Sequence, residues 1–510
     1  MGRSIQIMDT TLRDGEQTRG VSFTANEKLT IAKLLLNEVN VDRIEVASAR
    51  VSSGELEAVQ KITDWAKESN NLERIEVLTF VDGRQSITWM EAAGAKVMNL
   101  LTKGSMKHLK HQLKKTPKEH QDNIQEVLDY AKESDIKVNV YLEDWSNGMR
   151  HSKSYAKEML AFLCQSRVEK ILLPDTLGIL IPSETFDFIS EIIESFPDCH
   201  FDFHAHNDYD LGTANVYEAV RAGIHGLHLT VNGMGERAGN APLASSIAVL
   251  NDYADDIDIN VNEKNLFLVS KLVENISGLR IPANKPIVGS NVFTQTAGVH
   301  ADGDKKNNLY FSDLMPERFG RTREYALGKT SGKANIENNL EELGISLSDE
   351  DLKKVTRHII ELGDKKEIVT KDDLPYIISD VLNQSSVEEY VKVIKYVLTH
   401  ASDLQPSATI KVQIDEEIIE RSAQGDGQYD AFMNALKKIY KQKKLELPTL
   451  LDYSVRIPPG GKTDALCETF ITWDHGPKGL KTRGLDSDQT VSAIKATERM
   501  LNIVTKKYNG

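Results

Sequence analysis

Two histidines stand one residue apart in the segment FDFHAHNDYD, residues 201–210. The alternation of residue types in this segment predicts a β-strand. Residues i and i+2 of a strand point to the same side, so we expect His204 and His206 to face one cavity. Such a pair either binds a metal ion or packs and hydrogen-bonds inside a core. The strands and helices predicted around this segment indicate which interpretation is favoured.

Short β-branched segments alternate with amphipathic helical patterns through residues 1–265, and this order predicts parallel βαβ units. Eight such units are typical of a closed (β/α)8 TIM barrel. A doubly wound open sheet is the alternative, but no Gly-rich nucleotide fingerprint follows the first strand. The predicted strands span residues 5–10, 43–48, 74–80, 96–101, 137–142, 170–176, 200–206 and 223–232.

Functional residues of a parallel barrel gather at the carboxyl ends of its strands. Asp14 follows the first predicted strand in DTTLRDGEQ, and Asn240 follows the eighth in NGMGERAGNAP. Two imidazoles, a carboxylate and an amide oxygen make a mixed nitrogen–oxygen site. This set favours Mn²⁺, with Mg²⁺ or Zn²⁺ as alternatives.

Arg13 and Glu143 also come at strand ends. A guanidinium beside a metal-bound carbonyl would neutralise the charge that develops on the oxygen, although an Arg–Asp pair at a barrel mouth can also be purely structural. Glu143 is a candidate general base, whereas an isolated glutamate is more often a solvated surface group.

The remaining chain divides into two further segments. In residues 266–387, helical patterns surround a Gly- and Asn-rich stretch at 295–321, and ordered loops of this length are often functional. In residues 388–510, the stretches 408–439 and 467–501 both read as strand, turn, strand, turn and helix. We therefore expect a helical linker subdomain and then an α/β domain with an internal βα repeat.

The net charge of −14 disfavours a nucleic-acid partner, and no apolar run is long enough for a membrane span. We expect a cytoplasmic protein whose cysteines are unpaired and have no assigned role. They are Cys164, Cys199 and Cys467.

The motifs DTTLRDGEQ, HAHND, GMGERAGN and TAGVHADG together resemble the 2-isopropylmalate, homocitrate and citramalate synthase family. The resemblance covers nearly the whole chain and is strongest to the pyruvate-using (R)-citramalate synthases. It implies an acyltransferase that joins the methyl carbon of acetyl-CoA to a 2-oxo acid and then hydrolyses the thioester.

The resemblance also implies roles for individual residues. Asp14, His204, His206 and Asn240 match metal ligands; Arg13 matches the residue that steadies the oxo acid; Thr176 matches a carboxylate-binding threonine; and Glu143 matches the residue that helps to deprotonate the acetyl methyl group. His300, Asp302 and Tyr310 match residues that complete the site from the partner subunit, which implies a homodimer.

Leu78, Leu101 and Tyr141 match the walls of the substrate side-chain pocket. Bulky walls admit a methyl group and crowd an isopropyl group, which favours pyruvate over 2-oxoisovalerate, unless these residues are plain core packing.

The C-terminal repeat resembles the allosteric domain of the family, with Tyr429, Asp430, Tyr453 and Thr463 at the effector pocket. The expected effector is isoleucine for a citramalate synthase and leucine for an isopropylmalate synthase. Ala244 departs from the acidic residue that is expected after GNAPL.

Three alternatives to a citramalate synthase remain. A 2-isopropylmalate synthase would need a wider pocket. A metal-dependent lyase on the same barrel would need neither acetyl-CoA nor a regulatory domain. An inactive amino-acid-binding regulator would not need the full set of metal ligands.

Overall fold

The structure is a computed structural model of the chain. It describes residues 2–166, 168–305, 309–364, 369, 371, 374–382, 390–456, 467–475 and 479–508. The chain divides into two compact units, one of residues 1–294 with 307–324 and the other of residues 295–306 with 325–510.

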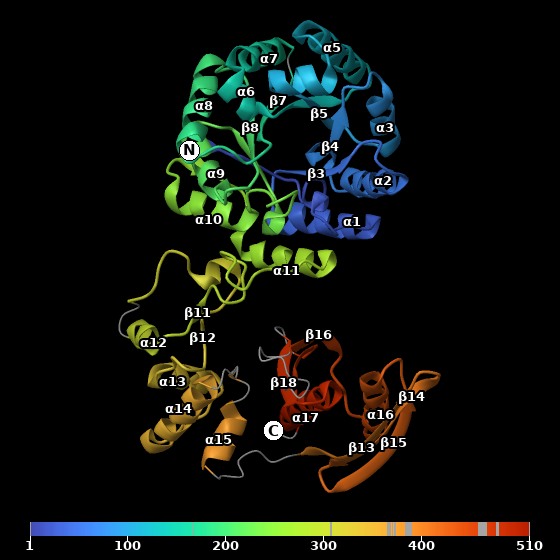
Figure 1. The fold of residues 1–510 in the computed structure, drawn as a ribbon, viewed down its shortest axis with the longest axis vertical. Helices are drawn as coiled ribbons and strands as arrows, with labels where there is room; N and C mark the ends of the chain where they lie inside the picture. Colours follow the sequence, from blue (N-terminus) through green and yellow to red (C-terminus); the bar gives the residue numbers. More distant parts are fainter. Residues whose placement is uncertain are drawn as a thin grey trace. The chain divides into compact units, whose positions relative to one another are not determined.

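The first unit contains a closed barrel of eight parallel strands in chain order, in which the first strand pairs with the last (Figure 1). The strands are β2 (Gln6–Asp9), β3 (Arg43–Ser48), β4 (Ile75–Phe80), β5 (Val97–Lys103), β6 (Lys137–Glu143), β7 (Lys170–Asp175), β8 (Phe201–Ala205) and β9 (Gly226–Leu229). All eight predicted strands are confirmed, and the open-sheet alternative is wrong. A separate parallel pair, β1 (Arg3–Ser4) and β10 (Ile257–Asp258), lies outside the barrel.

Helices form a ring around the strands (Figure 1). They are α1 (Ala25–Leu34), α2 (Ser53–Glu68), α3 (Gln85–Ala93), α4 (Met106–His108), α5 (Pro117–Glu133), α6 (Trp145–His151), α7 (Lys153–Gln165), α8 (Pro182–Ser195), α9 (Gly212–Arg221) and α10 (Leu243–Tyr253). A further helix, α11 (Leu266–Ser277), lies outside the ring and contacts α1 and α10. Thr24 and Glu27 form a capping box at the start of α1, which satisfies backbone N–H groups that have no partner within the helix.

The two faces of each barrel strand differ in chemistry, as β3 shows. Ile44 and Val46 belong to the apolar core that the helices cover. Arg43 and Glu45 lie on the opposite face, because side chains alternate along a strand, and both form buried ion pairs there. The interior of the barrel is therefore a charged, hydrogen-bonded layer enclosed by an apolar one.

The second unit begins with helices, and all but the first of them pack around a small apolar core of their own. They are α12 (Gly298–Lys305), α13 (Lys333–Glu342), α14 (Asp349–Asp364) and α15 (Leu374–Leu382). The short strands β11 (Thr294–Gln295) and β12 (Glu324–Tyr325) pair where the chain passes between the units. The helical patterns predicted beyond the stretch at 295–321 are confirmed by α14 and α15.

The C-terminal part of this unit confirms the internal repeat and adds a leading strand to each copy. The first copy is β13 (Val391–Ala401), β14 (Leu404–Ile414), β15 (Glu417–Gln424) and α16 (Gln428–Lys443); the second is β16 (Leu450–Arg456), β17 (Cys467–Trp473), β18 (Leu480–Asp486) and α17 (Gln489–Tyr508). Each copy forms an antiparallel three-stranded sheet, and both copies contribute to one apolar core that contains Phe432 and Trp473.

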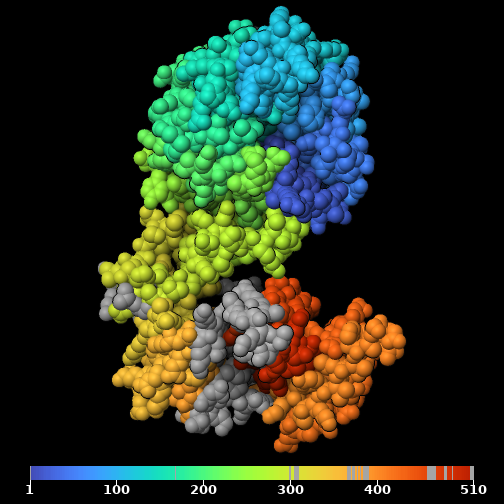
Figure 2. All heavy atoms as spheres, in the orientation of Figure 1, coloured from blue at the N-terminus to red at the C-terminus, as the bar shows by residue number. Residues whose placement is uncertain are grey.

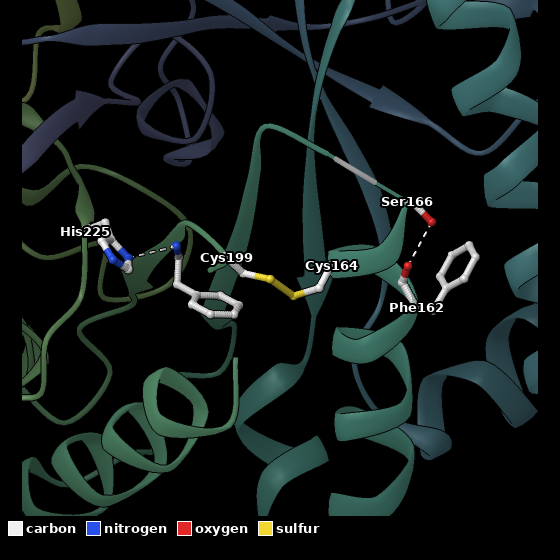
Figure 3. The surroundings of a disulfide bond; sticks show 6 residues. Phe162, Cys164, Ser166, Cys199 and His225 are labelled. Atoms are coloured by element: carbon white, nitrogen blue, oxygen red, sulfur yellow. Dashed lines mark hydrogen bonds between the residues drawn. A yellow bond between two sulfur atoms is a disulfide. The ribbon is translucent and has the colours of Figure 1, made fainter. Parts of the chain in front are cut away.

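The prediction of unpaired cysteines is wrong for Cys164 and Cys199, which form a disulfide with a Cα–Cα distance of 5.9 Å. Figure 3 shows that the bond joins the end of α7 to the segment that enters β8. The fold brings together two residues that are 35 positions apart in the sequence, and spacing alone could not reveal this. Cys467 is a free thiol.

None of the described helices is both long and apolar enough to cross a membrane.

Candidate active site

A cavity of about 200 Å³ lies among residues at and beyond the carboxyl ends of the barrel strands. It is lined by Arg13, Asp14, Gln17, Leu78, Leu101, Tyr141, Glu143, Pro174, Thr176, His204, His206 and Glu236. Every barrel residue predicted for the site is therefore here, except Asn240, which is fully buried and bonds to Asp14. Around the cavity, side chains fill most of the space that the ribbon leaves open at the centre of the barrel (Figures 1 and 2).

Asp14, His204 and His206 form a buried cluster whose potential ligand atoms all lie within 4.8 Å of one another. Burial lowers the pKa of His204 well below its usual range and lowers the pKa of His206 in the same direction, so both rings are neutral at neutral pH. Burial disfavours the charged form of Asp14, but the Arg13 guanidinium and the hydrogen bond from Asn240 hold its pKa well below the usual range. A carboxylate with two neutral imidazoles is the protonation state that a metal ion requires.

Asn240 completes this cluster through a buried amide. Its Nδ2 donates to Oδ1 of Asp14 at 2.8 Å and to the carbonyl oxygen of Met234 at 2.9 Å. Its Oδ1 has no hydrogen-bond partner among the described residues, and neither does Nδ1 of His204 or of His206. Buried polar atoms are rarely left without partners, so the Asn240 amide oxygen fits the donor set of a metal ion, and the His204 nitrogen that faces this set is Nε2, 3.7 Å from Oδ2 of Asp14.

Gly235 allows Asn240 to approach Asp14. Its φ is +150°, and a Cβ at this position would lie 2.2 Å from Nδ2 of Asn240 and 3.1 Å from Oδ1 of Asp14. Any larger residue would displace the amide from the cluster.

Arg13 is held rigidly beside the cluster. Its Nη1 lies 2.6 Å from Oδ2 of Asp14, its Nε donates to Oε2 of Glu45 at 2.7 Å, and its Nη2 donates to the Tyr141 hydroxyl at 3.2 Å. Burial opposes the charge, but the two carboxylates raise the pKa of Arg13 above its usual range. A fixed, permanently charged guanidinium can therefore stabilise an oxyanion without reorganising.

Glu45 is the residue of this site that sequence reasoning missed. It is fully buried on β3, where it also accepts hydrogen bonds from Oγ1 of Thr10 at 2.7 Å and from Nδ2 of Asn99 at 2.8 Å. The signal in the sequence was a glutamate inside the apolar segment RIEVAS, two positions after Arg43.

Glu143 and Thr176 stand at the ends of β6 and β7. The Glu143 carboxylate pairs with Lys103 and keeps 23% of its side chain exposed, so it is neither a free surface group nor a buried one. The Thr176 hydroxyl accepts a hydrogen bond from the backbone N–H of Asp144 at 2.9 Å, so its own hydrogen is free to face the cavity.

Leu78, Leu101 and Tyr141 form an apolar cluster with Leu172 behind them. Leu78 and Tyr141 are 6% and 3% exposed, yet both line the cavity. The structure therefore brings the three predicted wall residues together on one side of the site.

The other predicted residues lie elsewhere in the chain. His300 and Asp302 are on α12 in the second unit, where Nδ1 of His300 lies 3.2 Å from Oε1 of Gln295. Tyr310 follows α12 and is 43% exposed. The role of these three residues in a partner's site remains a prediction.

The predicted effector residues are partly assembled. The rings of Tyr429 and Tyr453 lie 5.5 Å apart, and the Tyr429 hydroxyl lies 2.7 Å from Oγ1 of Thr497. Asp430, in the first turn of α16, is exposed and accepts a hydrogen bond from the backbone N–H of Asp426 at 3.0 Å. Thr463 lies outside the described residues.

Ala244 lies in the first turn of α10, where it is 8% exposed within the apolar core. A small apolar residue suits this buried place.

Three family models match successive parts of the chain: HMGL-like over residues 4–273, homocitrate synthase post-HMGL domain-like over residues 287–367, and LeuA allosteric (dimerisation) domain over residues 368–505. The chain is 35% identical to a putative (R)-citramalate synthase of Methanopyrus kandleri over 92% of its own length and 89% of the relative's. It is 34% identical to the (R)-citramalate synthase of Methanocaldococcus jannaschii over 98% and 99%, and 33% identical to a probable 2-isopropylmalate synthase of Methanopyrus kandleri over 99% of both. The chain therefore belongs to the 2-isopropylmalate, homocitrate and citramalate synthase family, an HMGL-like family of enzymes that transfer acyl groups.

Proposed function

We propose that this enzyme condenses acetyl-CoA with pyruvate to form (R)-citramalate and CoA. The observation that carries the choice of pyruvate is the apolar wall of Leu78, Leu101 and Tyr141, which lies in the same cavity as Arg13 and the metal cluster. Leucine and tyrosine side chains leave room for a methyl group there and crowd an isopropyl group.

Asp14, His204, His206 and Asn240 would hold a divalent ion, Mn²⁺ by preference, which would polarise the oxo group of the substrate when bound. Arg13 stabilises the negative charge that develops on that oxygen, and Thr176 donates a hydrogen bond to the substrate carboxylate.

The Glu143 carboxylate takes a proton from the methyl group of acetyl-CoA. The resulting carbon nucleophile forms a bond to the oxo carbon of pyruvate as the C=O π bond breaks, and the oxygen then takes a proton from solvent to become the hydroxyl group. Water then cleaves the thioester, and CoA leaves as the free thiol. Lys103 forms an ion pair with Glu143 and so orients that carboxylate at the end of β6.

We propose a homodimer in the cytoplasm, in which His300, Asp302 and Tyr310 of one subunit complete the site of the other. The match to a LeuA allosteric (dimerisation) domain supports both the dimer and feedback control. For a citramalate synthase the proposed effector is isoleucine, bound beside Tyr429, Asp430 and Tyr453.

The test is release of CoA thiol with pyruvate and with 2-oxoisovalerate, each before and after treatment with EDTA and again after addition of Mn²⁺. The proposal expects turnover with pyruvate, loss of turnover with EDTA and recovery with Mn²⁺. A faster reaction with 2-oxoisovalerate would reject the choice of pyruvate, and thiol release that resists EDTA would reject the metal.

The second candidate is a 2-isopropylmalate synthase, with leucine as the effector. It is supported by the probable 2-isopropylmalate synthase of Methanopyrus kandleri, which the chain matches over 99% of both lengths. The same assay separates the two candidates.

A further inference from the structure

The Tyr141 hydroxyl is fixed from two sides. It accepts a hydrogen bond from Nη2 of Arg13 at 3.2 Å, and it lies 2.9 Å from Nδ1 of His228. Burial, and then the Glu45 carboxylate, raise the pKa of Tyr141 well above its usual range, so the hydroxyl keeps its proton. A hydroxyl with one proton and this geometry donates that proton to His228.

His228 lies behind Tyr141 on β9, is fully buried and does not line the cavity. Its Nε2 lies 3.2 Å from Oδ2 of Asp202, and its ring meets the ring of Tyr141 edge to face at 5.5 Å. Burial disfavours the charge of Asp202, but Arg43 holds its pKa well below the usual range. Because the Asp202 carboxylate accepts, Nε2 of His228 donates to it, and in that tautomer Nδ1 accepts from the Tyr141 hydroxyl.

Asp202 is itself anchored on β8. Arg43 donates to its Oδ2 at 2.5 Å, and Nε2 of His200 lies 2.9 Å from its Oδ1. Arg43 also pairs with Glu76 at 2.7 Å. These contacts therefore connect Tyr141 in the cavity wall, through His228 and Asp202, to ion pairs between strands in the interior of the barrel.

We propose that His228 and Asp202 are positioning residues for this enzyme, which fix the Tyr141 hydroxyl and so set the width of the pocket and the orientation of Arg13. This inference rests on the proposed function. Neither residue touches the substrate, and both act through Tyr141.

Loss of the His228 acceptor has a definite consequence, because the next acceptor within reach of the Tyr141 hydroxyl is Oε2 of Glu45 at 3.4 Å. That oxygen already receives Nε of Arg13. A hydroxyl that turns toward Glu45 competes with Arg13 and draws the ring away from its place in the wall. Both the KM for the oxo acid and the preference for a short side chain should then change.

Two substitutions of His228 separate the two contacts of its ring, one with Tyr141 and one with Asp202. His228→Asn places an amide oxygen where Nδ1 was and keeps an acceptor for Tyr141. His228→Gln places its amide near the former Nε2 and keeps a partner for Asp202, but removes the acceptor for Tyr141. Tyr141→Phe removes the hydroxyl itself.

The experiment measures kcat and KM of the full-length enzyme for pyruvate and for 2-oxoisovalerate in wild type, in the three variants and in the double variant H228Q/Y141F. H228Q and Y141F should each raise the KM for pyruvate and lower the preference for pyruvate about 3- to 10-fold, the effect of one hydrogen bond. H228N should be impaired less than H228Q, because it keeps the acceptor for Tyr141 and loses only the contact with Asp202. The double variant should match Y141F, since two residues that act through one bond are not additive.

Independent effects that multiply in the double variant would overturn the inference, and so would an H228N variant as impaired as H228Q. If the wild type prefers 2-oxoisovalerate, the proposed substrate is wrong, but the non-additivity of the two positions still decides the role of His228.

A second measurement needs only folded wild type and Y141F. In protein labelled with ¹⁵N-histidine, the Nδ1 resonance of one ring, that of His228, should shift in Y141F. An unchanged set of histidine resonances would contradict the bond.

Discussion

Nδ2 of Asn240 donates a hydrogen bond of 2.8 Å to Oδ1 of Asp14, across 226 positions of sequence. Since the amide nitrogen is held by Asp14 and by the carbonyl oxygen of Met234, the amide oxygen is the atom left to bind a cation. The Asn240 side chain thus combines two tasks, orienting a carboxylate and offering an oxygen of its own.

Replacing Asn240 with alanine should weaken Mn²⁺ binding at least about 10-fold, because it removes a ligand and the partner that orients Asp14. Titration of Mn²⁺ followed by electron paramagnetic resonance measures this directly. Asn215→Ala is the matched control, since Asn215 is also buried and its Oδ1 has no partner in the described part of the chain, but it lies on α9. Equal Mn²⁺ affinity in the two variants would remove Asn240 from the ligand set.

Glu45→Gln should raise the KM for the oxo acid, because Arg13 loses the carboxylate that holds its Nε and Nη2. Weakening a buried ion pair should also lower the free energy of unfolding, by about 3 kcal/mol. Glu76→Gln provides the comparison, because Glu76 on β4 forms a buried ion pair with Arg43 and not with Arg13. Its stability should fall by a similar amount while the KM stays at the wild-type value. A KM that rises equally in both variants would mean that Glu45 acts only on stability.

Leu101→Ala should allow 2-oxoisovalerate to compete with pyruvate. The shorter side chain widens the wall by three carbon atoms, and discrimination by such a wall is worth about 1 to 3 kcal/mol, a shift of roughly 5- to 150-fold in the ratio of kcat/KM values. Leu128→Ala controls for general loosening of the barrel. Leu128 is a partly buried residue of α5 that packs against the apolar core between the strands and the helices. An unchanged ratio in the Leu101 variant would place the specificity pocket elsewhere.

Asp9→Asn should stabilise the enzyme increasingly as the pH rises. Burial raises the pKa of Asp9 to about 7, far above its value in an unfolded chain, so the folded state holds a proton that the unfolded state has lost. The protonated form of Asp9 contributes fully to the free energy of unfolding below pH 4. This contribution is lost as the pH rises through 7, by up to about 1.4 kcal/mol per pH unit. Asparagine does not ionise, so the variant does not lose this stability at higher pH. Its side chain still accepts the hydrogen bond from the backbone N–H of Thr11. Urea unfolding of both proteins at pH 5 and pH 8 tests the prediction. A stability difference that is the same at the two pH values would show that Asp9 is ionised in the fold.

Reduction of the Cys164–Cys199 bond should lower the melting temperature. The bond closes a segment of 35 residues. A cross-link of that length restricts the unfolded chain and so raises the free energy of unfolding by about 4 kcal/mol. Cys164→Ser should melt at the lower temperature with or without a thiol reductant, whereas the wild type should respond to the reductant. Cys467→Ser, which removes the free thiol, should retain the response of the wild type. Identical melting of oxidised and reduced wild type would show that the bond does not stabilise the fold.

Much of the barrel and its site could be predicted from the sequence, because two general rules apply to it. Alternation of strand and helix patterns gives the barrel, and the rule that functional residues lie at carboxyl strand ends brings Asp14, His204 and Glu143 together although they are far apart in the chain.

The interior of the barrel could not be predicted in the same way. Glu45 and His228 lie within strands, where alternation gives the face of a side chain but not its partner. The partner depends on the register between strands; Tyr141 and His228, for example, are 87 positions apart. The disulfide depends in the same way on the relation between a helix end and a strand start.

The order of strands around the barrel has a consequence for assembly. The first strand, β2, closes the barrel against the last, β9, and Asp14 and Asn240 follow these two strands. The proposed metal site therefore spans the seam at which the cylinder closes. A chain emerging from the ribosome could not form this site until residue 240 had been made, and a bound ion would hold the two ends of the strand order together. If the ion binds only the closed barrel, it should raise the free energy of opening between β2 and β9 by RT ln(1 + [M]/Kd), where [M] is the concentration of the ion.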